Sequence, residues 1–200
     1  MERTPTAFAD ALSSGEAEQV NRAIDEVDDM ELEERAALFD ACFAVCRDVY
    51  ETDDGYQRQS AIRFAAALYP RLELRTVGTD FTDDALPDEH TVDETASHRD
   101  RLRELYLDAL VDDDGRVRRA AAKAIKELAL TAELIGTDAE LQTMTEQLES
   151  LGLARSGPEQ THIEQAYENV AVHAEQPGSI FPDDLRAGFT QQESTDTDES

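Results

Sequence analysis

The chain reads Asp53-Asp54-Gly55-Tyr56-Gln57-Arg58-Gln59-Ser60-Ala61, and sixty residues later it reads Asp113-Asp114-Gly115-Arg116-Val117-Arg118-Arg119-Ala120-Ala121. Both stretches lead into small and apolar residues and reach a leucine at the same offset, Leu68 and Leu128. Self-similarity of this kind indicates stacked supersecondary units. Each Asp-Asp-Gly lies between two helix-like segments, so the repeated unit is a helical hairpin. The predicted fold class is all-α, a short α-solenoid of antiparallel helical hairpins.

Helical periodicity is clearest in the segment that precedes the first Asp-Asp-Gly. One apolar stripe runs from Leu32 to Tyr50, and a second stripe that contains Leu38 and Val49 lies beside it. So wide an apolar face predicts a helix that packs on two sides. After the turn, apolar residues from Ala61 to Leu72 line a partner helix, which Pro70 should end or kink.

The pattern breaks at residues 76–97, which carry seven acidic side chains and no lysine or arginine. A loop of this length is uncommon in a compact domain, so it is functional, disordered or hides a short helix. The second hairpin is expected to begin near Ser97, and Gly136 should stop its second helix.

Both ends of the chain also have predictable structure. Thr4 and Pro5 are a good cap and first residue for a short N-terminal helix. Two further periodic segments follow Gly136, and Phe181, Leu185 and Phe189 could form an amphipathic cap. We therefore expect one helical domain over residues 1–189, with the 76–97 insertion, and a disordered acidic tail over 190–200.

The second hairpin resembles a HEAT repeat, including the HEAT-like units of the phycobilisome-lyase type. In that family an Asp at the turn is followed by Val-Arg, spaced alanines and a leucine, and the matching residues here are Asp113, Val117, Arg118, Ala121 and Leu128. In the first hairpin Asp53, Arg58, Ala61 and Leu68 match, but Gln57 replaces the valine. The resemblance covers residues 31–72 and 98–130. It implies a structural role in the turns for Asp53, Asp54, Arg58, Asp113, Asp114 and Arg118, whose Asp and Arg side chains would tie successive turns together.

The composition is extreme in charge. The chain has a net charge of -28, and its 18 basic residues include only two lysines, Lys123 and Lys126. Many acids with few lysines and no tryptophan resemble a protein of a salt-accumulating, haloarchaeal cell, in which molar salt screens repulsion between the acids. An acidic protein of an ordinary cell is the alternative. An acidic coat of this kind says little about partners.

Targeting signals are not evident in the sequence. No run of about twenty apolar residues predicts a transmembrane helix, and the N-terminus lacks the basic flank and apolar stretch of a signal peptide. The two cysteines, Cys42 and Cys46, do not form a disulfide framework. The chain is expected to be soluble and cytoplasmic, without membrane association.

Basic side chains gather in one part of the sequence. Residues 99–126 hold eight of the 18 basic residues beside six acidic ones. At helical spacing, one face is shared by Arg116, Arg119, Lys123 and Lys126. In a HEAT hairpin the second helix usually lines the concave surface, so we assign these four residues, with Arg63, to a candidate partner-binding surface.

Two interpretations of this basic stripe remain open. It is either a groove for phosphates or an acidic protein segment, or a solvated face whose charges balance neighbouring acids such as those of 76–97. Few aromatic residues accompany the stripe, so stacking of single-stranded bases is not indicated. If nucleic acid binds here, the acidic segment 76–97 or the tail 190–200 could compete for the stripe.

The cysteines raise the question of a metal. Cys42 and Cys46 are one helical turn apart and could hold half of a zinc site completed by His90 and His98. Both cysteines, however, lie on apolar stripes, and cysteine packs well as a small hydrophobe. Packing is the preferred interpretation, and no metal or cofactor is predicted.

Known catalytic motifs are absent from the sequence, including phosphate-binding glycine loops, nucleophile elbows and zinc-protease spacing. The first hypothesis is therefore a non-enzymatic scaffold or adaptor that binds a protein partner on its concave face. The second is a nucleic-acid-associated protein that uses the stripe from Arg116 to Lys126. A lyase-like enzyme is a third possibility, by family analogy alone.

Overall fold

The computed structural model describes residues 1–76, 82–87 and 90–175, and the regular structure in these ranges is entirely helical. The predicted all-α class is confirmed. The α-helices are α1 (Pro5–Ser13), α2 (Ala17–Asp28), α3 (Leu32–Tyr50), α4 (Gly55–Leu68), α5 (Val92–Leu110), α6 (Gly115–Leu134), α7 (Asp138–Leu153) and α8 (Pro158–Glu175). Two 3-10 turns, η1 (Leu72–Thr76) and η2 (Asp83–Ala85), separate α4 from α5.

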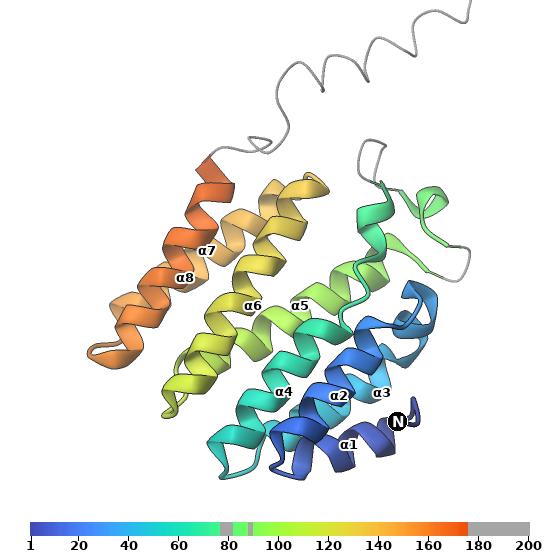
Figure 1. Ribbon diagram of the computed structural model, residues 1–200. Helices are drawn as coiled ribbons and strands as arrows, with labels where there is room; N and C mark the ends of the chain where they lie inside the picture. Colours follow the sequence, from blue (N-terminus) through green and yellow to red (C-terminus); the bar gives the residue numbers. More distant parts are fainter. Residues whose placement is uncertain (77–81, 88–89, 176–200) are drawn as a thin grey trace, which may run out of the picture.

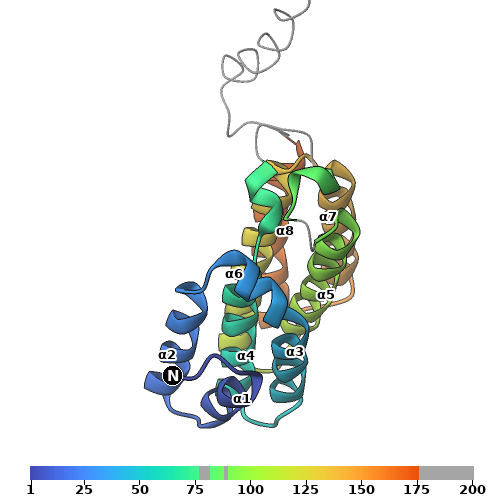
Figure 2. The ribbon, with the colours of Figure 1, turned by 90° about the vertical axis from the view of Figure 1, so that its right-hand side faces the viewer.

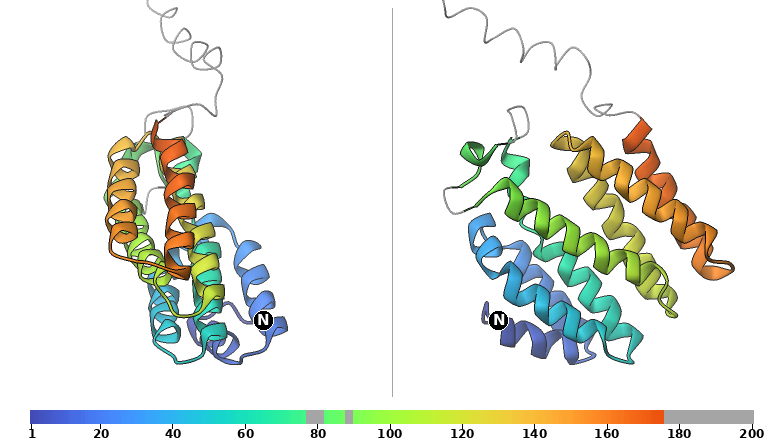
Figure 3. Two further views of the ribbon diagram at one scale, coloured as in Figure 1. Left: turned by 90° about the vertical axis from the view of Figure 1, so that its left-hand side faces the viewer. Right: turned by 180° about the vertical axis from the view of Figure 1, so that it is seen from behind.

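The helices form four consecutive hairpins that stack side by side in two layers. Helices α2, α4, α6 and α8 lie in one layer, which faces the viewer in Figure 1, and α1, α3, α5 and α7 lie in the other, which Figure 3 shows from behind. Figure 2 shows the two layers edge-on. Within the first layer, α4 packs against both α2 and α6, and α6 packs against α8. The second helices of two successive hairpins, α4 and α6, therefore lie side by side.

The hydrophobic core is continuous between the two layers. One cluster of buried side chains extends from Phe8 in α1 to Val170 in α8. Alanines contribute many of its members, especially on α6, where Ala121, Ala124 and Ala129 are buried. Because alanine has so small a side chain, these positions allow neighbouring helices to approach closely.

Polar side chains cap the helices that follow turns. The hydroxyl of Thr4 accepts a hydrogen bond from the Ala7 N–H at the start of α1, as the sequence predicts. Asp54 and Asp114 cap α4 and α6 in the same way. Gly136 has a φ of 74°, which glycine adopts without strain, and lies just after the end of α6. The glycines and aspartates of the sequence thus set the helix boundaries.

The 76–97 insertion is shorter than the sequence indicates. Helix α5 begins at Val92, five residues before Ser97, and Thr91 caps it by accepting a hydrogen bond from the Glu94 N–H. Within the described part of the segment, residues 83–85 form a 3-10 turn, and Leu86 is buried in a small cluster beside α3. The many acidic residues hid this local structure, because they mask the helical period of the first turns of α5.

A buried ion network holds η1, α5 and α7 together. Arg99 of α5 donates hydrogen bonds to Glu73 of η1 over 2.8 Å and to both carboxylate oxygens of Glu140 in α7. Tyr69 donates a hydrogen bond to the same Glu73 carboxylate. Burial raises the pKa of Glu73, although Arg99 opposes this effect. The network ties three elements that lie far apart in the sequence.

A second network joins the two Asp-Asp-Gly turns. The Arg58 guanidinium, at the start of α4, donates two hydrogen bonds to the Asp112 carboxylate, of 2.8 and 2.9 Å, and pairs with Asp113. It also donates to the carbonyl oxygen of Thr52 in its own turn. Arg118 donates to the carbonyl oxygens of Asp112 and Asp113 in its own turn. These contacts hold the N-terminal ends of α4 and α6 in register.

Several expectations fall outside the described residues. These are the amphipathic cap formed by Phe181, Leu185 and Phe189, and the tail at 190–200. In the part of the chain that the structure describes, no helix is long and apolar enough to cross a membrane.

Candidate partner-binding groove

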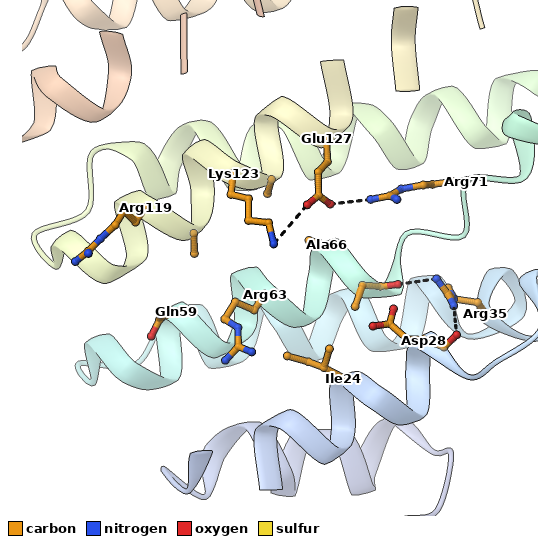
Figure 4. A pocket seen from close by; sticks show the side chains of 13 residues that line it. Ile24, Asp28, Arg35, Gln59, Arg63, Ala66, Arg71, Arg119, Lys123 and Glu127 are labelled. Carbon is orange, nitrogen blue, oxygen red and sulfur yellow. Dashed lines mark hydrogen bonds and ion pairs between the residues drawn. The ribbon is translucent and has the colours of Figure 1, made fainter. Parts of the chain in front are cut away.

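A groove with a volume of about 500 Å³ runs along the face of the α2, α4 and α6 layer. We call it the α4–α6 groove, because those two helices form its walls, while α2 and the start of α3 close its lower side in Figure 4. Its charged lining is predominantly basic and consists of Arg35, Arg63, Arg71, Arg119 and Lys123, against the acidic Asp28 and Glu127. The groove is thus a positive surface on a chain whose net charge is -28.

The helical period explains why these side chains share one face. On α6, Arg119, Lys123 and Glu127 are separated by four residues each, and such residues lie above one another along a helix. On α4 the same spacing relates Gln59 and Arg63. Between the charged residues the groove has an aliphatic floor made of Ile24, Ala66, Ala67, Ala120 and Ala124. The small floor residues allow α4 and α6 to lie close and leave room above them.

Two arginines give the groove its free positive charge, Arg119 near the start of α6 and Arg63 in the middle of α4 (Figure 4). Arg63 donates a hydrogen bond to the amide oxygen of Asn21 over 2.9 Å, and Arg119 makes a long hydrogen bond of 3.4 Å to the Gly115 carbonyl oxygen. Among the described residues, neither guanidinium lies within ion-pair distance of a carboxylate, although 46 acidic residues are present in the chain. Both are available to an anionic group from outside.

The end of the groove at which α4 ends holds both acidic residues of its lining, Asp28 and Glu127. Arg71 donates a hydrogen bond of 2.8 Å to Glu127, which also lies 3.8 Å from the Lys123 ammonium group (Figure 4). Arg35 donates to the backbone carbonyl oxygens of Ala67 and Asp28, and burial lowers the pKa of its guanidinium. These groups join α6, α4 and α3 and leave little free charge at this end.

The structure brings together only part of the predicted basic stripe. Arg119 and Lys123 line the groove with Arg63, but Arg116 and Lys126 do not. Arg116 turns back to the Asp114 carboxylate, with hydrogen bonds of 2.6 to 3.2 Å. Lys126 is exposed on α6 outside the groove. At three residues from Lys123, its side chain is displaced around the helix, away from α4.

Sequence analysis missed two of the basic residues, Arg35 and Arg71, and the acidic Glu127. Arg71 follows Pro70 and has a positive φ of 51°, so no helical period relates it to α4. The repeat itself offered a signal for the groove. Arg63 and Lys123 are sixty residues apart, as are Gln59 and Arg119, and thus occupy equivalent positions in the two hairpins.

Of the four candidate zinc ligands, Cys42, Cys46 and His98 are buried, whereas His90 is partly exposed beside Glu94. Cys42 and Cys46 are free and buried, and burial raises the pKa of the Cys42 thiol to about 11. The His98 ring stacks against Phe39 at a centroid distance of 4.0 Å, and burial lowers its pKa. Among residues 1–76, 82–87 and 90–175, no three His, Cys, Asp or Glu side chains are grouped in a way that could hold a metal ion. Both thiols lie in the hydrophobic core cluster.

Comparison with known proteins adds no relative. The sequence matches no family model, and neither the curated proteins nor the solved structures contain a match to it.

Proposed function

We propose that this chain is a HEAT-like α-solenoid that acts as a non-enzymatic scaffold or adaptor and binds a protein partner in the α4–α6 groove. The observation that carries the proposal is the pair of groove arginines, Arg63 and Arg119, which have no carboxylate partner among the described residues of a strongly acidic chain. A cation that only balanced the protein surface would be expected to contact one of the surrounding acids.

The layered hairpins support the same proposal. Stacked helical hairpins create extended surfaces that such proteins use for binding, and here the second helices α2, α4 and α6 form one continuous surface. The Arg58 to Asp112 contact fixes α4 against α6, so the two walls of the groove are held at a defined separation. A rigid groove binds with a smaller entropy cost than a mobile one.

A nucleic acid is the second candidate partner. The exposed Lys126 extends the positive surface of α6 beyond the groove, and phosphate contacts need only positive charge. The lack of aromatic residues in the groove argues against binding that depends on base stacking.

The test is an affinity capture from cells that produce the protein, with a double charge reversal in the groove. Arg63→Glu with Arg119→Glu should abolish capture of the partner, since it replaces both free cations with anions. The matched control is Arg22→Glu with Arg155→Glu, which makes the same change in net charge on α2 and in the turn between α7 and α8, outside the groove. Circular dichroism checks that both variants remain folded.

Nuclease treatment before capture separates the two candidates. A partner that survives nuclease, binds the control and is lost with the groove variant is the expected result. Equal capture by both variants would contradict the groove proposal, and loss of all partners after nuclease would favour the nucleic-acid alternative.

A further inference from the structure

The α4–α6 groove has an uneven distribution of charge along its length. Arg119 lies near the start of α6, Arg63 lies in the middle of α4, and Arg71 lies at the far end of the groove, where it pairs with Glu127. Lys123 lies between the two ends, is 79 % exposed and is held only by a 3.8 Å contact to Glu127. A ligand should therefore place its anionic groups at Arg119 and between Arg63 and Lys123.

The aliphatic floor of the groove favours a ligand that also carries apolar groups. Ile24, Ala66, Ala67, Ala120 and Ala124 are aliphatic, and no aromatic side chain lines the groove. Aliphatic side chains placed on this floor would be removed from contact with water, which favours binding. Nucleobases would find no aromatic ring to stack on.

The charge of the whole chain favours a ligand with few anionic groups. Double-stranded DNA carries about one negative charge per 1.7 Å of its length, and most of these charges would extend past the groove and face a chain of net charge -28. A protein segment can instead carry two or three carboxylates at the required positions and remain apolar elsewhere. It gains the charge-assisted hydrogen bonds of the arginines without the wider repulsion.

We infer that the α4–α6 groove binds an acidic protein segment, in which carboxylates contact Arg63 and Arg119 and neighbouring aliphatic side chains pack on the alanine floor. This inference rests on the proposed function and adds the chemical class of the partner. The Lys123 ammonium leaves Glu127 and contacts a further carboxylate of the ligand. Arg71 remains bound to Glu127 and does not take part.

The experiment measures fluorescence anisotropy with defined probes. The first is a labelled peptide of Glu-Leu-Ala repeats, the second is the Gln-Leu-Ala peptide of the same length, and the third is single-stranded DNA of the same net charge as the first. Binding is measured in about 0.15 M and about 1 M KCl, at which the Debye lengths are about 8 Å and 3 Å. At the higher salt, long-range repulsion from the acidic surface is screened, while contacts in the groove persist.

The Glu-Leu-Ala peptide should bind at least about tenfold more tightly than the Gln-Leu-Ala peptide, because charge-assisted hydrogen bonds are the stronger ones. It should bind at least about tenfold more tightly than the DNA, because its leucines pack on the aliphatic floor, whereas the bases find no aromatic ring there. Arg63→Glu with Arg119→Glu should weaken its binding at least about tenfold. The milder Arg63→Gln with Arg119→Gln should weaken it in the same direction, and Arg22→Glu with Arg155→Glu should leave it unchanged.

Three results would overturn the inference. These are equal binding of both peptides, tighter binding of the DNA, and binding of the acidic peptide that the groove variants do not change. If none of the probes binds, but the capture of a cellular partner still depends on Arg63 and Arg119, the acidic class is wrong and the proposed function stands. If capture ignores these arginines, the proposed function itself fails.

Discussion

The two Asp-Asp-Gly turns have nearly the same sequence but unequal structural roles. Arg58 and its equivalent Arg118 each donate to a carbonyl oxygen six residues earlier in their own turn. Arg58 also reaches the carboxylates of Asp112 and Asp113 in the next turn. Arg118 forms no such pair within the described residues, because the turn between α7 and α8 carries Arg155, Ser156 and Gly157 in place of acids.

The difference shows that successive hairpins of the stack are joined by different contacts. The Arg58 network joins the turns at which α4 and α6 begin. The last hairpin is joined away from the turns, by apolar packing of α6 against α8 and by the pairs Arg99 with Glu140 and Glu133 with His173. The spacing of α4 and α6 is also the width of the proposed binding groove. The tie at Arg58 is thus placed where a defined separation matters for binding.

Removal of the Asp112 carboxylate should have the largest effect. Its side chain is 6 % exposed and that of Arg58 is 12 % exposed, so Asp112→Ala leaves a poorly solvated guanidinium with fewer partners. Breaking a buried pair from one side costs about 3 kcal/mol or more of unfolding free energy. Asp112 also accepts hydrogen bonds from Tyr50 and from the Asp114 N–H, which the variant loses.

Urea unfolding followed by circular dichroism measures this loss. Arg118→Ala is the matched comparison, and it should cost less, because it breaks bonds to backbone carbonyls within one turn and leaves no unpaired carboxylate. Equal losses for the two variants would show that the inter-turn tie adds nothing to the local turn contacts.

The two turn glycines form a second matched pair. A Cβ at Gly55 would overlap the Asp114 carboxylate and lie 2.8 Å from its Cγ, whereas a Cβ at Gly115 would meet only Arg118 Nη2, at 3.3 Å. We expect Gly55→Ala to lower the free energy of unfolding by about 1 to 2 kcal/mol, because Asp114 must move from its cap. Gly115→Ala should be near neutral, because alanine favours helix and the arginine can shift.

Thermal unfolding of both variants gives the answer. A tolerated Gly55→Ala would mean that the turns lie further apart than the structure shows.

Acid should weaken the same junction in a defined pH window. Arg116 lowers the pKa of Asp114 to about 2. Burial alone would raise the pKa of Asp112, but Arg58 and the Asp114 N–H bring it below the ordinary value of 3.8. Since both pKa values are depressed by folding, the stability they provide is present above about pH 4 and is lost as the pH falls toward about 2.

Asp114→Asn keeps a capping side chain and removes the titrating group. The variant should cost about 0.5 to 1 kcal/mol at neutral pH and lose less stability than the wild type between about pH 4 and 2. Unfolding titrations at several pH values test this, and parallel profiles for the two proteins would assign the acid sensitivity to other groups.

Salt should have the smallest effect on the difference in stability between the wild type and Asp112→Ala. We propose that the acidic composition is an adaptation to high salt, so the melting temperature of the wild type should rise between tens of millimolar and molar KCl as screening relieves the charge of -28. The deficit of Asp112→Ala should change by less than about 0.5 kcal/mol, because a poorly solvated pair is screened little. A melting temperature independent of KCl would contradict the adaptation.

Sequence periodicity predicts the helices, but it does not predict the contacts between hairpins. The stripes around Phe39 and Ala121 follow from residues a few positions apart, which the chain itself displays. The Arg99 pairs with Glu73 and Glu140 join residues 26 and 41 positions apart, and only the stacking of the hairpins brings them together.

The candidate site shows the same limit. Arg119 and Lys123 are found from spacing on one helix, and Arg63 occupies the position equivalent to Lys123 in the repeat. Arg116 shares the same spacing but does not line the groove, and spacing does not reveal that its guanidinium turns back to Asp114. Arg71 could not be found, since its position depends on an irregular turn after α4.

Site-specific cross-linking tests most directly whether the partner lies in the α4–α6 groove. Cys42 and Cys46 are buried, so a single added cysteine can carry a thiol-reactive photo-cross-linker, either as Gln59→Cys in the groove or as Glu104→Cys on the exposed side of α5 in the other layer. If the partner lies in the groove, we expect it to be cross-linked from position 59 and not from position 104. Cross-linking from position 104 with none from position 59 would contradict it.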